Sequence, residues 1–595
     1  MHTLVVHAHC YQPPREDPWL ELVEAEPSAA PDHDWNARID RECYARLGAA
    51  EVRAPDPGAA ARDPDARGGL ARIVNLYAWC SFDVGPTLCE WMDRSSGTFA
   101  SMREGDEASI ARLGHGNAIA APYHHIILPL ASRRDKVSEV RWGIADFTRR
   151  FGRAPEGMWL PECAVDEETL EVLALEGIRF TILAPYQVRA ATDHYGMPVR
   201  WRAGASRSIA ILPYDGALAG DVAFGGLLQN ARALAERFTR AGGDDIVRCT
   251  TLATDGETFG HHHRNGNAAL AEALSLVRRT PTRISNAAAV VAAHEPTIDV
   301  ELVSPSSWSC AHGVERWRSD CGCRLDSSAN TSQSWRRPLR DTLTRIAARC
   351  HDEFEHRGRE LYQRDPWEVR DEFGAVVAQE GAALEQFVRA RLRHPSEEHV
   401  VEGRSLLELE RAVMRTFTSC AWFFDDIARI EVRQVLRYAA RALELSGLAG
   451  RLEPELITGL DTAVSNVAGG GTGADLFVRE ALPHHDPALR AAAGIAALLF
   501  TGEEHVGGGI HGAYEGGVVA VPDDRSSMTL RVVHRRTGAA SLVEARIEGE
   551  GPALTVLVRR SASGTGWQNF SIRDLPEHAA RIVLAAHASG PRALD

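Results

Sequence analysis

Two acidic clusters stand where apolar runs of the chain end and glycine or proline begins. Residues 157–164 read GMWLPECA and contain Glu162, and residues 253–261 read ATDGETFGH and contain Asp255 and Glu257. If each apolar run is a strand of a parallel α/β fold, these acids lie at the carboxyl ends of strands, where such folds build their sites. The two clusters are therefore the first candidates for chemistry.

A pair of carboxyl groups with different roles is what cleavage of a glycosidic bond requires. One group must be ionised to attack the anomeric carbon, and the other must be protonated to release the leaving oxygen. An acid at the end of a strand can equally cap a helix or face water in a loop. The clusters are consistent with cleavage of a glycosidic bond, but further sequence features are needed to favour it over a role in a cap or a loop.

The surrounding sequence predicts the elements that would position these acids. The run TLVVHA at residues 3–8 predicts a buried first strand that brings His7 and His9 to its carboxyl end. Further strands are expected at residues 180–183, 208–212 and 246–253, with a helix at 166–175. Strands that alternate with helices predict a parallel sheet, closed into a barrel.

The character of the sequence changes twice after this region. Helical patterns dominate from about residue 336 and include residues 405–445. After Met528 the segments TLRVVHRR, ALTVLVRR and RIVLAAH predict strands. We therefore expect three domains: an α/β catalytic domain at 1–335, a helical domain at 336–520 and a small β-rich domain at 521–595.

The overall composition excludes several classes of protein. With 44% hydrophobic and 25% charged residues the chain is an ordinary globular one, and its net charge of −15 argues against nucleic acid as the main partner. No apolar run approaches the ~20 residues that span a bilayer. The start MHTLVVHAHCYQPP does not have the form of a signal peptide. We expect a cytoplasmic protein without a membrane partner, with its eleven cysteines mostly free thiols.

Four regions, in order along the chain, resemble the signature regions of glycoside hydrolase family 57. They are HAHCYQP at 7–13, YHHIILPL at 123–130, WLPE at 159–162 and DGETFG at 255–260. The best candidate for a fifth region is TSCAWFFDD at 418–426. Because the family's enzymes act on oligosaccharides or polysaccharides, the resemblance implies a glycoside hydrolase or transglycosidase for α-linked glucans, of the α-amylase or α-glucanotransferase type.

The resemblance also implies a (β/α)7 barrel, a retaining double-displacement mechanism, no cofactor and no metal. Glu162 would be the nucleophile and Asp255 the acid/base. For Asp255 to hold a proton near neutral pH its pKa must rise, and burial and the negative charge of Glu162 would both raise it. The side chains expected to bind substrate around these acids are His9, Gln12, His125, Trp159, Glu257, Trp308 and Trp422.

Two other functions fit parts of the sequence. A metal-dependent deacetylase or an α-mannosidase-like enzyme could use His7, His9, Asp255 and one of the histidines 261–263 as ligands. A glycan-binding protein on an inactive barrel would need neither acid. The sequence alone does not choose between water and a sugar as acceptor, and it does not give the oligomeric state.

A separate group of residues could bind a structural metal. Cys310, His312, Cys321 and Cys323 are four possible zinc ligands, but their spacing is not that of a zinc finger or ribbon, where two to four residues separate the cysteines of a pair. We therefore expect no structural metal here, and we expect residues 306–317 to form a loop over the site, in which Trp308 and Trp317 line the sugar cleft.

Overall fold

The structure is a computed structural model, and it describes residues 2–53, 71–190, 196–204, 207–239, 248–326, 328–501, 509–521, 527–561 and 566–588. The contacts divide the chain into two units. Unit 1 consists of Met1–Pro14, Ser28–Arg336 and Phe417–Asp425, and unit 2 consists of Arg15–Pro27, Arg337–Thr416 and Asp426–Asp595. The division into three domains at 335 and 520 stays a prediction, because unit 2 contains both helices and a sheet.

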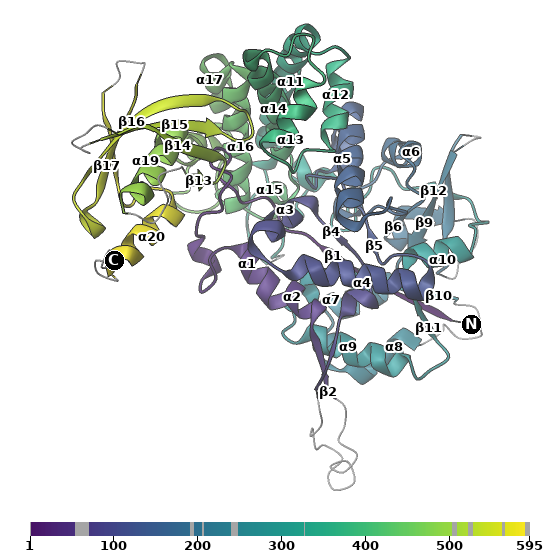
Figure 1. Ribbon diagram of the computed structural model, residues 1–595. Helices are drawn as coiled ribbons and strands as arrows, with labels where there is room; N and C mark the ends of the chain where they lie inside the picture. Colours follow the sequence, from purple (N-terminus) through teal and green to yellow (C-terminus); the bar gives the residue numbers. More distant parts are fainter. Residues whose placement is uncertain are drawn as a thin grey trace. The chain divides into compact units, whose positions relative to one another are not determined.

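A parallel sheet lies at the centre of unit 1 (Figure 1). The predicted first strand is β1 (Thr3–Cys10), which pairs in parallel with β4 (Ser81–Val84) and β10 (Cys249–Asp255). The sheet continues from β4 to β5 (Ala118–Ile119), and β11 (Arg283–Ser285) also pairs with β1. The predicted α/β class with a parallel sheet is thus confirmed.

Further parallel contacts continue beyond β5. Ala120 bridges to Met158, and Gly157 bridges to Phe180, the first residue of β6 (Phe180–Leu183). Strand β6 pairs in parallel with β9 (Arg207–Pro213). A backbone hydrogen bond from Asp215 N to Thr251 O, 2.7 Å long, then joins the residues after β9 to β10.

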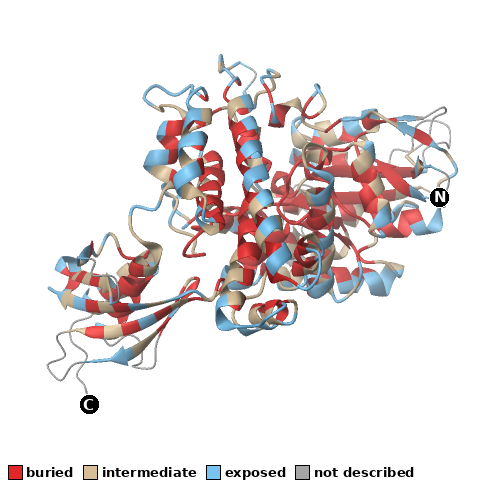
Figure 2. Cartoon of the chain, turned by 90° about the horizontal axis from the view of Figure 1, so that it is seen from above, coloured by how far each residue is buried: buried red, intermediate tan, exposed pale blue. Residues whose placement is uncertain are grey.

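The strands of this sheet are buried on both faces, which explains their uninterrupted apolar runs. In β1 every residue from Leu4 to Cys10 is buried, and in β6 all four residues are buried (Figure 2). The longer helices of unit 1 are α3 (Pro86–Ser95), α4 (Thr98–Leu113), α5 (Arg133–Phe151), α6 (Glu167–Leu175), α7 (Gly216–Ala223), α8 (Ala231–Thr239), α9 (Gly266–Val277) and α10 (Ala287–Ala293), and the shorter α1 (Trp35–Ile39) and α2 (Ala45–Gly48) precede them.

The helix predicted at 166–175 shows how local sequence sets these boundaries. Asp166 is its N-cap, and its side chain accepts a hydrogen bond from Thr169 N. The first turn of α6 then has Glu167 and Glu168, whose charges suit the positive end of a helix. Helix α6 follows directly on the acidic cluster of Glu162, so its start fixes where that cluster ends.

The helices of unit 2 do not form the continuous helical stretch expected at 405–445. Helix α14 (Glu397–Arg415) ends inside this range. Helix α16 (Ile430–Ser446) begins fifteen residues after that end and packs against α14. The residues between include Phe417–Asp425, which belong to unit 1 and contain the short helix α15 (Cys420–Phe423). Other helices of unit 2 are α12 (Pro366–Phe373), α13 (Ala382–Arg389), α17 (Ala449–Leu460) and most of α11 (Arg336–Leu361).

Unit 2 also contains an antiparallel sheet, as its alternating sequence predicts. The strands follow in chain order: β13 (Gly509–His511), β14 (Tyr514–Ala520), β15 (Met528–His534), β16 (Ala540–Glu548), β17 (Thr555–Arg560) and β18 (Gln568–Ser571). The sheet starts before the predicted boundary at 521, and its apolar face packs against α19 (Pro487–Phe500). The expectation of a strand for RIVLAAH is wrong, because these residues lie in α20 (Glu577–Ala588), where Ala579 and Val583 are buried at helical spacing.

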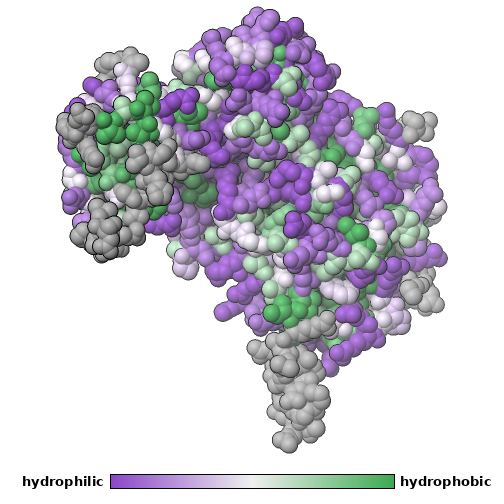
Figure 3. Space-filling view, viewed as in Figure 1, coloured by the Kyte–Doolittle hydropathy of each residue, from purple (hydrophilic) through white to green (hydrophobic). Residues whose placement is uncertain are grey.

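The visible surface is largely hydrophilic. Figure 3 shows mostly hydrophilic side chains on the face that it presents, with hydrophobic residues scattered among them. Over the described residues, no helix is both long and apolar enough to cross a bilayer.

Candidate active site

The carboxyl ends of three neighbouring strands bring polar groups together in unit 1. In the parallel register of the sheet, His9 of β1 is the partner of Asp255 on β10 and of Asp83 on β4. This arrangement puts a histidine between two acids at the edge where α/β folds build sites. The predicted positions of His9 and Asp255 therefore agree with the structure, and Asp83 is a third member that the sequence did not reveal.

His9 is bound tightly by Asp83. Its Nδ1 lies 2.9 Å from Asp83 Oδ2 and 3.1 Å from Oδ1, and His7 Nε2 lies 3.1 Å from the same Oδ1. Burial alone would lower the pKa of His9, but the charge of Asp83, with smaller contributions from Asp255 and Glu257, raises it to about 9. His9 is therefore a buried cation, and Asp83, whose pKa is lowered against its own burial, is the carboxylate that balances it.

The chain of hydrogen bonds from Asp83 through His9 continues to a second histidine. His9 Nε2 lies 3.1 Å from His125 Nε2, and His125 Nδ1 lies 2.8 Å from Ser419 Oγ. Burial and the positive charge of His9 lower the pKa of His125 well below its ordinary value. Neutral His125 therefore accepts from His9 and donates to Ser419. His125 has a φ of 56°, a left-handed conformation that costs energy in a residue with a Cβ and is common at functional sites.

Glu162 shares this unusual backbone. Its φ is 58°, in the segment that joins residue 158 of the sheet to α6. Ser309 Oγ donates to Glu162 Oε2 at 2.6 Å, and Trp308 Nε1 donates to the same oxygen at 3.1 Å. Trp308 N also donates to Glu162 O at 3.0 Å. Two donors thus orient one carboxylate oxygen, and the other, Oε1, has no hydrogen-bond partner among the residues that the structure describes.

Asp255 is in a different electrostatic environment. Burial first, and then the negative charges of Glu257 and Glu162, raise its pKa to about 7, although His9 opposes the shift. The expected causes, burial and the charge of Glu162, both contribute, and Glu257 adds a third. The next residue, Gly256, packs closely against β1, since a Cβ at this position would lie 2.9 Å from Cys10 Sγ.

Glu257 is held from the side by two residues of unit 1. Gln12 Nε2 donates to Glu257 Oε1 at 3.1 Å, and the hydroxyl of Tyr44 donates to the same oxygen. The Tyr44 hydroxyl also lies 3.2 Å from Tyr11 O. Glu257 is buried, so these donors compensate for the water that it loses. Gln12 and Glu257, both expected to bind substrate, are thus joined to each other, and their contact with a substrate stays a prediction.

The predicted tryptophans differ in what they can contact. Trp308 is half-buried and lies edge-on to Trp159 with ring centroids 5.1 Å apart. Trp159 is fully buried and stacks on His7 and His9, so its ring supports the histidines and has no exposed face for a sugar. Trp422 is also fully buried, and its Nε1 donates to Arg336 O at 3.2 Å. In this conformation neither Trp159 nor Trp422 can contact a substrate as expected; the part of the fifth region that reaches the site is Ser419.

Some members of the site gave only weak signals in the sequence. Asp83 is the single acid of a four-residue strand, SFDV, followed directly by Gly85 and Pro86. A charged residue inside such a short apolar run is the signal that could have found it. Ser309, Ser419 and Tyr44 are of residue types too common in ordinary loops and cores to be singled out.

The ligands that a metal-dependent enzyme would need are used in other ways. His7 and His9 both face Asp83, His261 Nδ1 lies 2.7 Å from Glu42 Oε2, and His263 Nε2 lies 2.8 Å from Ala223 O. In the described part of the chain, one group of three or more metal-ligating side chains lies close enough to share an ion, and it consists of Cys310, His312, Cys321 and Cys323.

Comparison with known proteins identifies the class of this site. Residues 80–301 match the family model of glycosyl hydrolase family 57, and residues 332–511 match a domain of unknown function, DUF3536. The protein is an enzyme of the glycoside hydrolase type. Within that class, residues 80–301 are similar to glycosyl hydrolase family 57, the family whose signature regions the four motifs resemble.

Several solved structures are similar to this chain at low sequence identity, and the first of them supports the fold. The exo-type maltose-forming amylase of Pyrococcus sp. ST04 has 13% identity and a TM-score of 0.57, over 77% of this chain and 82% of that one. The branching enzyme of Pyrococcus horikoshii has 14% identity and a TM-score of 0.46, over 77% and 92%. The 4-alpha-glucanotransferase of Thermococcus litoralis has 12% identity and a TM-score of 0.45, over 94% and 84%. Among curated proteins, none matches the chain.

Proposed function

We propose that the protein is a retaining glycoside hydrolase or transglycosidase that acts on α-linked glucans by double displacement. Glu162 is the nucleophile that attacks C1 of the sugar and forms a glycosyl-enzyme. Asp255 first protonates the leaving oxygen and then deprotonates the incoming water or sugar hydroxyl. The choice of an α-glucan follows the amylase, branching enzyme and glucanotransferase whose structures are similar.

One observation carries the assignment of roles: the two acids have different environments. Asp255, with a pKa raised to about 7, can hold a proton at neutral pH and release it. Glu162 is oriented by donors on Oε2, and Oε1 is left to attack. A pair of carboxyl groups separated in this way supplies both the acid and the nucleophile.

The barrel is part of the proposal. Seven parallel segments follow one another in space: β10, β1, β4, β5, residues 157–158, β6 and β9. The hydrogen bond from Asp215 N to Thr251 O returns from β9 to β10. These contacts support a closed (β/α)7 barrel, in which all the strand ends face one cleft.

The test separates the two acids by the stereochemistry of their products. With Asp255→Ala an α-maltosyl fluoride still glycosylates Glu162, because fluoride leaves without a proton, and the enzyme then stalls. Azide needs no deprotonation, so it should restore turnover and give a maltosyl azide of retained configuration. With Glu162→Ala azide can only attack the substrate directly, and the product should be inverted. Glu167→Ala, an exposed acid in α6, is the matched control and should retain full activity.

The outcomes also distinguish the competing functions. Opposite stereochemistry in the two variants would exchange the two roles. A glycan-binding protein would form no glycosyl-enzyme with the wild-type chain, and a metal-dependent enzyme would lose its activity to a chelator even in a chain without the thiols of Cys321 and Cys323. Products from maltoheptaose and amylose, resolved by size and linkage, would then identify the acceptor.

A further inference from the structure

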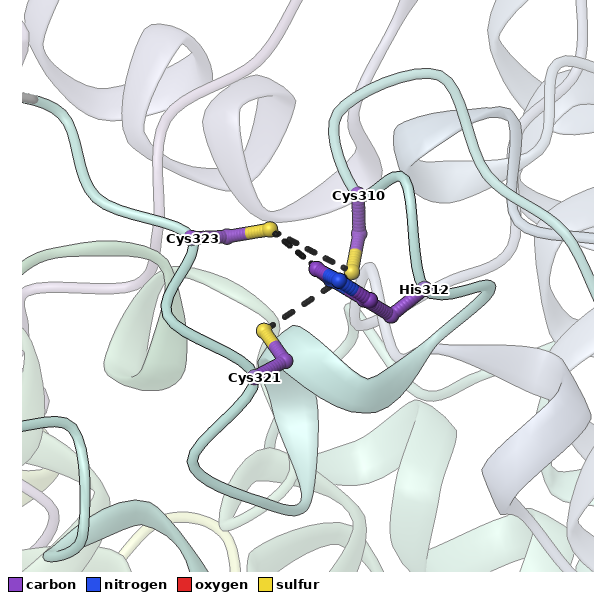
Figure 4. Close-up of side chains that lie close together, drawn as sticks. All are labelled: Cys310, His312, Cys321 and Cys323. Carbon is purple, nitrogen blue, oxygen red and sulfur yellow. Dashed lines mark hydrogen bonds between the residues drawn. The ribbon is translucent and has the colours of Figure 1, made fainter.

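Two separate turns bring four possible metal ligands together near the nucleophile. Cys310 and His312 come from the first turn, and Cys321 and Cys323 come from the second (Figure 4). One ligand atom from each residue lies within 4.8 Å of the other three. Figure 4 shows the four side chains pointing toward a common centre. We call these four residues the Cys3His cluster.

Three distances in the cluster are close to the edges of a tetrahedral zinc site, and the others are within 4.8 Å. Cys310 Sγ lies 3.9 Å from Cys321 Sγ and 3.7 Å from Cys323 Sγ, and Cys323 Sγ lies 3.6 Å from His312 Nδ1. A tetrahedral zinc ion with bonds of about 2.3 Å to sulfur and about 2.0 Å to nitrogen sets edges of about 3.8 Å between sulfurs and about 3.5 Å between sulfur and nitrogen. The ligand set also suits zinc, since thiolate and imidazole are its usual ligands.

A disulfide does not explain the cluster. The sulfur–sulfur distances of 3.7 and 3.9 Å are well beyond the ~2.05 Å of a disulfide bond. A disulfide would use two of the three thiols and give no role to the third or to His312. Simple burial does not explain it either, because Cys321 and Cys323 are half-exposed.

The backbone of both turns is built for this convergence. Gly322 separates Cys321 from Cys323 with a φ of 77°, and Gly313 follows His312 with a φ of 78°. Residues with a Cβ rarely adopt this conformation, so glycine allows each pair of ligands to turn toward the same point. In each pair one residue lies between the two ligands, which is closer than in a zinc finger. The two glycines make this spacing compatible with binding of one ion.

A buried arginine supports the second turn. Arg336 Nη1 donates to Cys323 O at 3.1 Å and lies 4.0 Å from Cys321 Sγ. Its Nη2 donates to Phe424 O at 3.2 Å. Three thiolates and one divalent zinc leave one negative charge, which a guanidinium at this position balances. The cluster therefore already has an outer partner of the kind that orients thiolate ligands.

We propose that Cys310, His312, Cys321 and Cys323 bind one structural zinc ion that fixes the loop after β12 (Val300–Leu302). The expectation that these residues bind no metal followed from spacing alone and is replaced by this proposal. Cys310 directly follows Ser309 and Trp308, the two donors to Glu162. The ion thus ties these donors to the turn at 321–323. The zinc site does not depend on the proposed glycosidase activity.

The test measures metal in the full chain, purified without chelators. Elemental analysis should find about one zinc per chain, and Cys321→Ser and Cys323→Ser should each lose most of it. Cys420→Ser is the matched control, because Cys420 is also half-exposed but lies outside the cluster, and it should keep its zinc. Cobalt exchanged into the wild-type chain should give the absorption of tetrahedral thiolate-bound Co²⁺, a reading that needs no variant.

Three results would overturn the proposal. The first is a wild-type chain without zinc whose cobalt form lacks thiolate bands. The second is zinc content unchanged in both serine variants. The third is a disulfide within the cluster, found as missing thiols in the unfolded, unreduced protein. Each of these results can be obtained whether or not the protein cleaves glucans.

Discussion

Buried acids in the two units meet different neighbours. In unit 2, Glu410 accepts from Arg370 Nη1 at 2.7 Å and lies 3.0 Å from His351 Nδ1. Burial alone would raise the pKa of Glu410, but His351 and Arg370 lower it. Glu408 has the same kind of environment, with Arg536 as its main partner. In unit 1, Asp255 is surrounded by further acids, and its pKa is raised to about 7.

The difference distinguishes buried acids that stabilise the fold from buried acids that can take part in proton transfer. A buried acid with an arginine beside it has its charge satisfied, and it stabilises the fold as long as the pair is complete. A buried acid beside other acids is kept ready to take and give a proton, at a cost to stability. Removing each kind of acid or its partner should therefore affect different measurements.

The largest expected effect is on the stability of unit 2. Arg370→Met leaves Glu410 buried with its arginine gone, and should lower the free energy of unfolding by about 3–5 kcal/mol. Asp255→Asn removes a repelled charge and should leave that free energy unchanged or higher. Urea unfolding followed by circular dichroism measures both.

Arg364→Met is the control for the arginine, because Arg364 pairs with Glu368 and Glu372 at the exposed surface. Its loss should have little effect on unfolding. If Asp255→Asn destabilised the protein as much as Arg370→Met, the comparison between the two units would be wrong.

The next effect, on activity, concerns the loop over Glu162. Ser309→Ala removes the 2.6 Å hydrogen bond to Oε2 and should lower kcat/KM by about ten- to a hundredfold, the usual range for a hydrogen bond to a charged group. Ser309→Thr keeps the hydroxyl and should retain most of the activity. An unchanged kcat/KM in Ser309→Ala, measured on an α-maltosyl fluoride, would remove Ser309 from the site.

The smallest effect is the pH dependence of stability, which has opposite signs for the two acids. Asp255 has a folded pKa near 7, above its ordinary 3.8, so the folded state holds the proton longer than the unfolded state. The wild type should therefore lose stability relative to Asp255→Asn as pH rises from about 4 to 7.

Glu410 has a lowered pKa, so its contribution is present above its ordinary pKa of 4.5 and is lost as pH falls below it. The wild type should lose stability relative to Glu410→Gln in that acidic range. Unfolding curves between about pH 2 and pH 8 test both signs, and slopes of the same sign for the two pairs would contradict the assignment.

The strands and the acids at their ends could be predicted from the sequence, because a strand buried on both faces consists of an uninterrupted run of apolar residues. The runs at 3–8, 180–183 and 208–212 are strands in the structure. Prediction from the sequence failed where tertiary context overrides the local pattern. RIVLAAH has apolar residues for a strand, yet these residues fold as a helix that packs against α19 and shares its hydrophobic core.

The parts of the site that sequence reasoning missed depend on distance in space. Nothing in SFDV tells that Asp83 lies between two histidines, because the register of three strands decides it. The Cys3His cluster was named from its residue types, but spacing within each pair argued against it. Only the convergence of two turns, each allowed by a glycine, brings the four ligands within reach of one ion.

The return of the chain to unit 1 at Phe417–Asp425 affects the order in which the enzyme can be completed during synthesis. A chain that is made from its N-terminus has Glu162 and Asp255 early, but it gains Ser419, the partner of His125, only after Arg337–Thr416 has been translated. Closing so long an insertion costs little extra free energy, since loop entropy grows slowly with length. The nascent chain thus contains both acids before it contains Ser419, the residue that fixes His125.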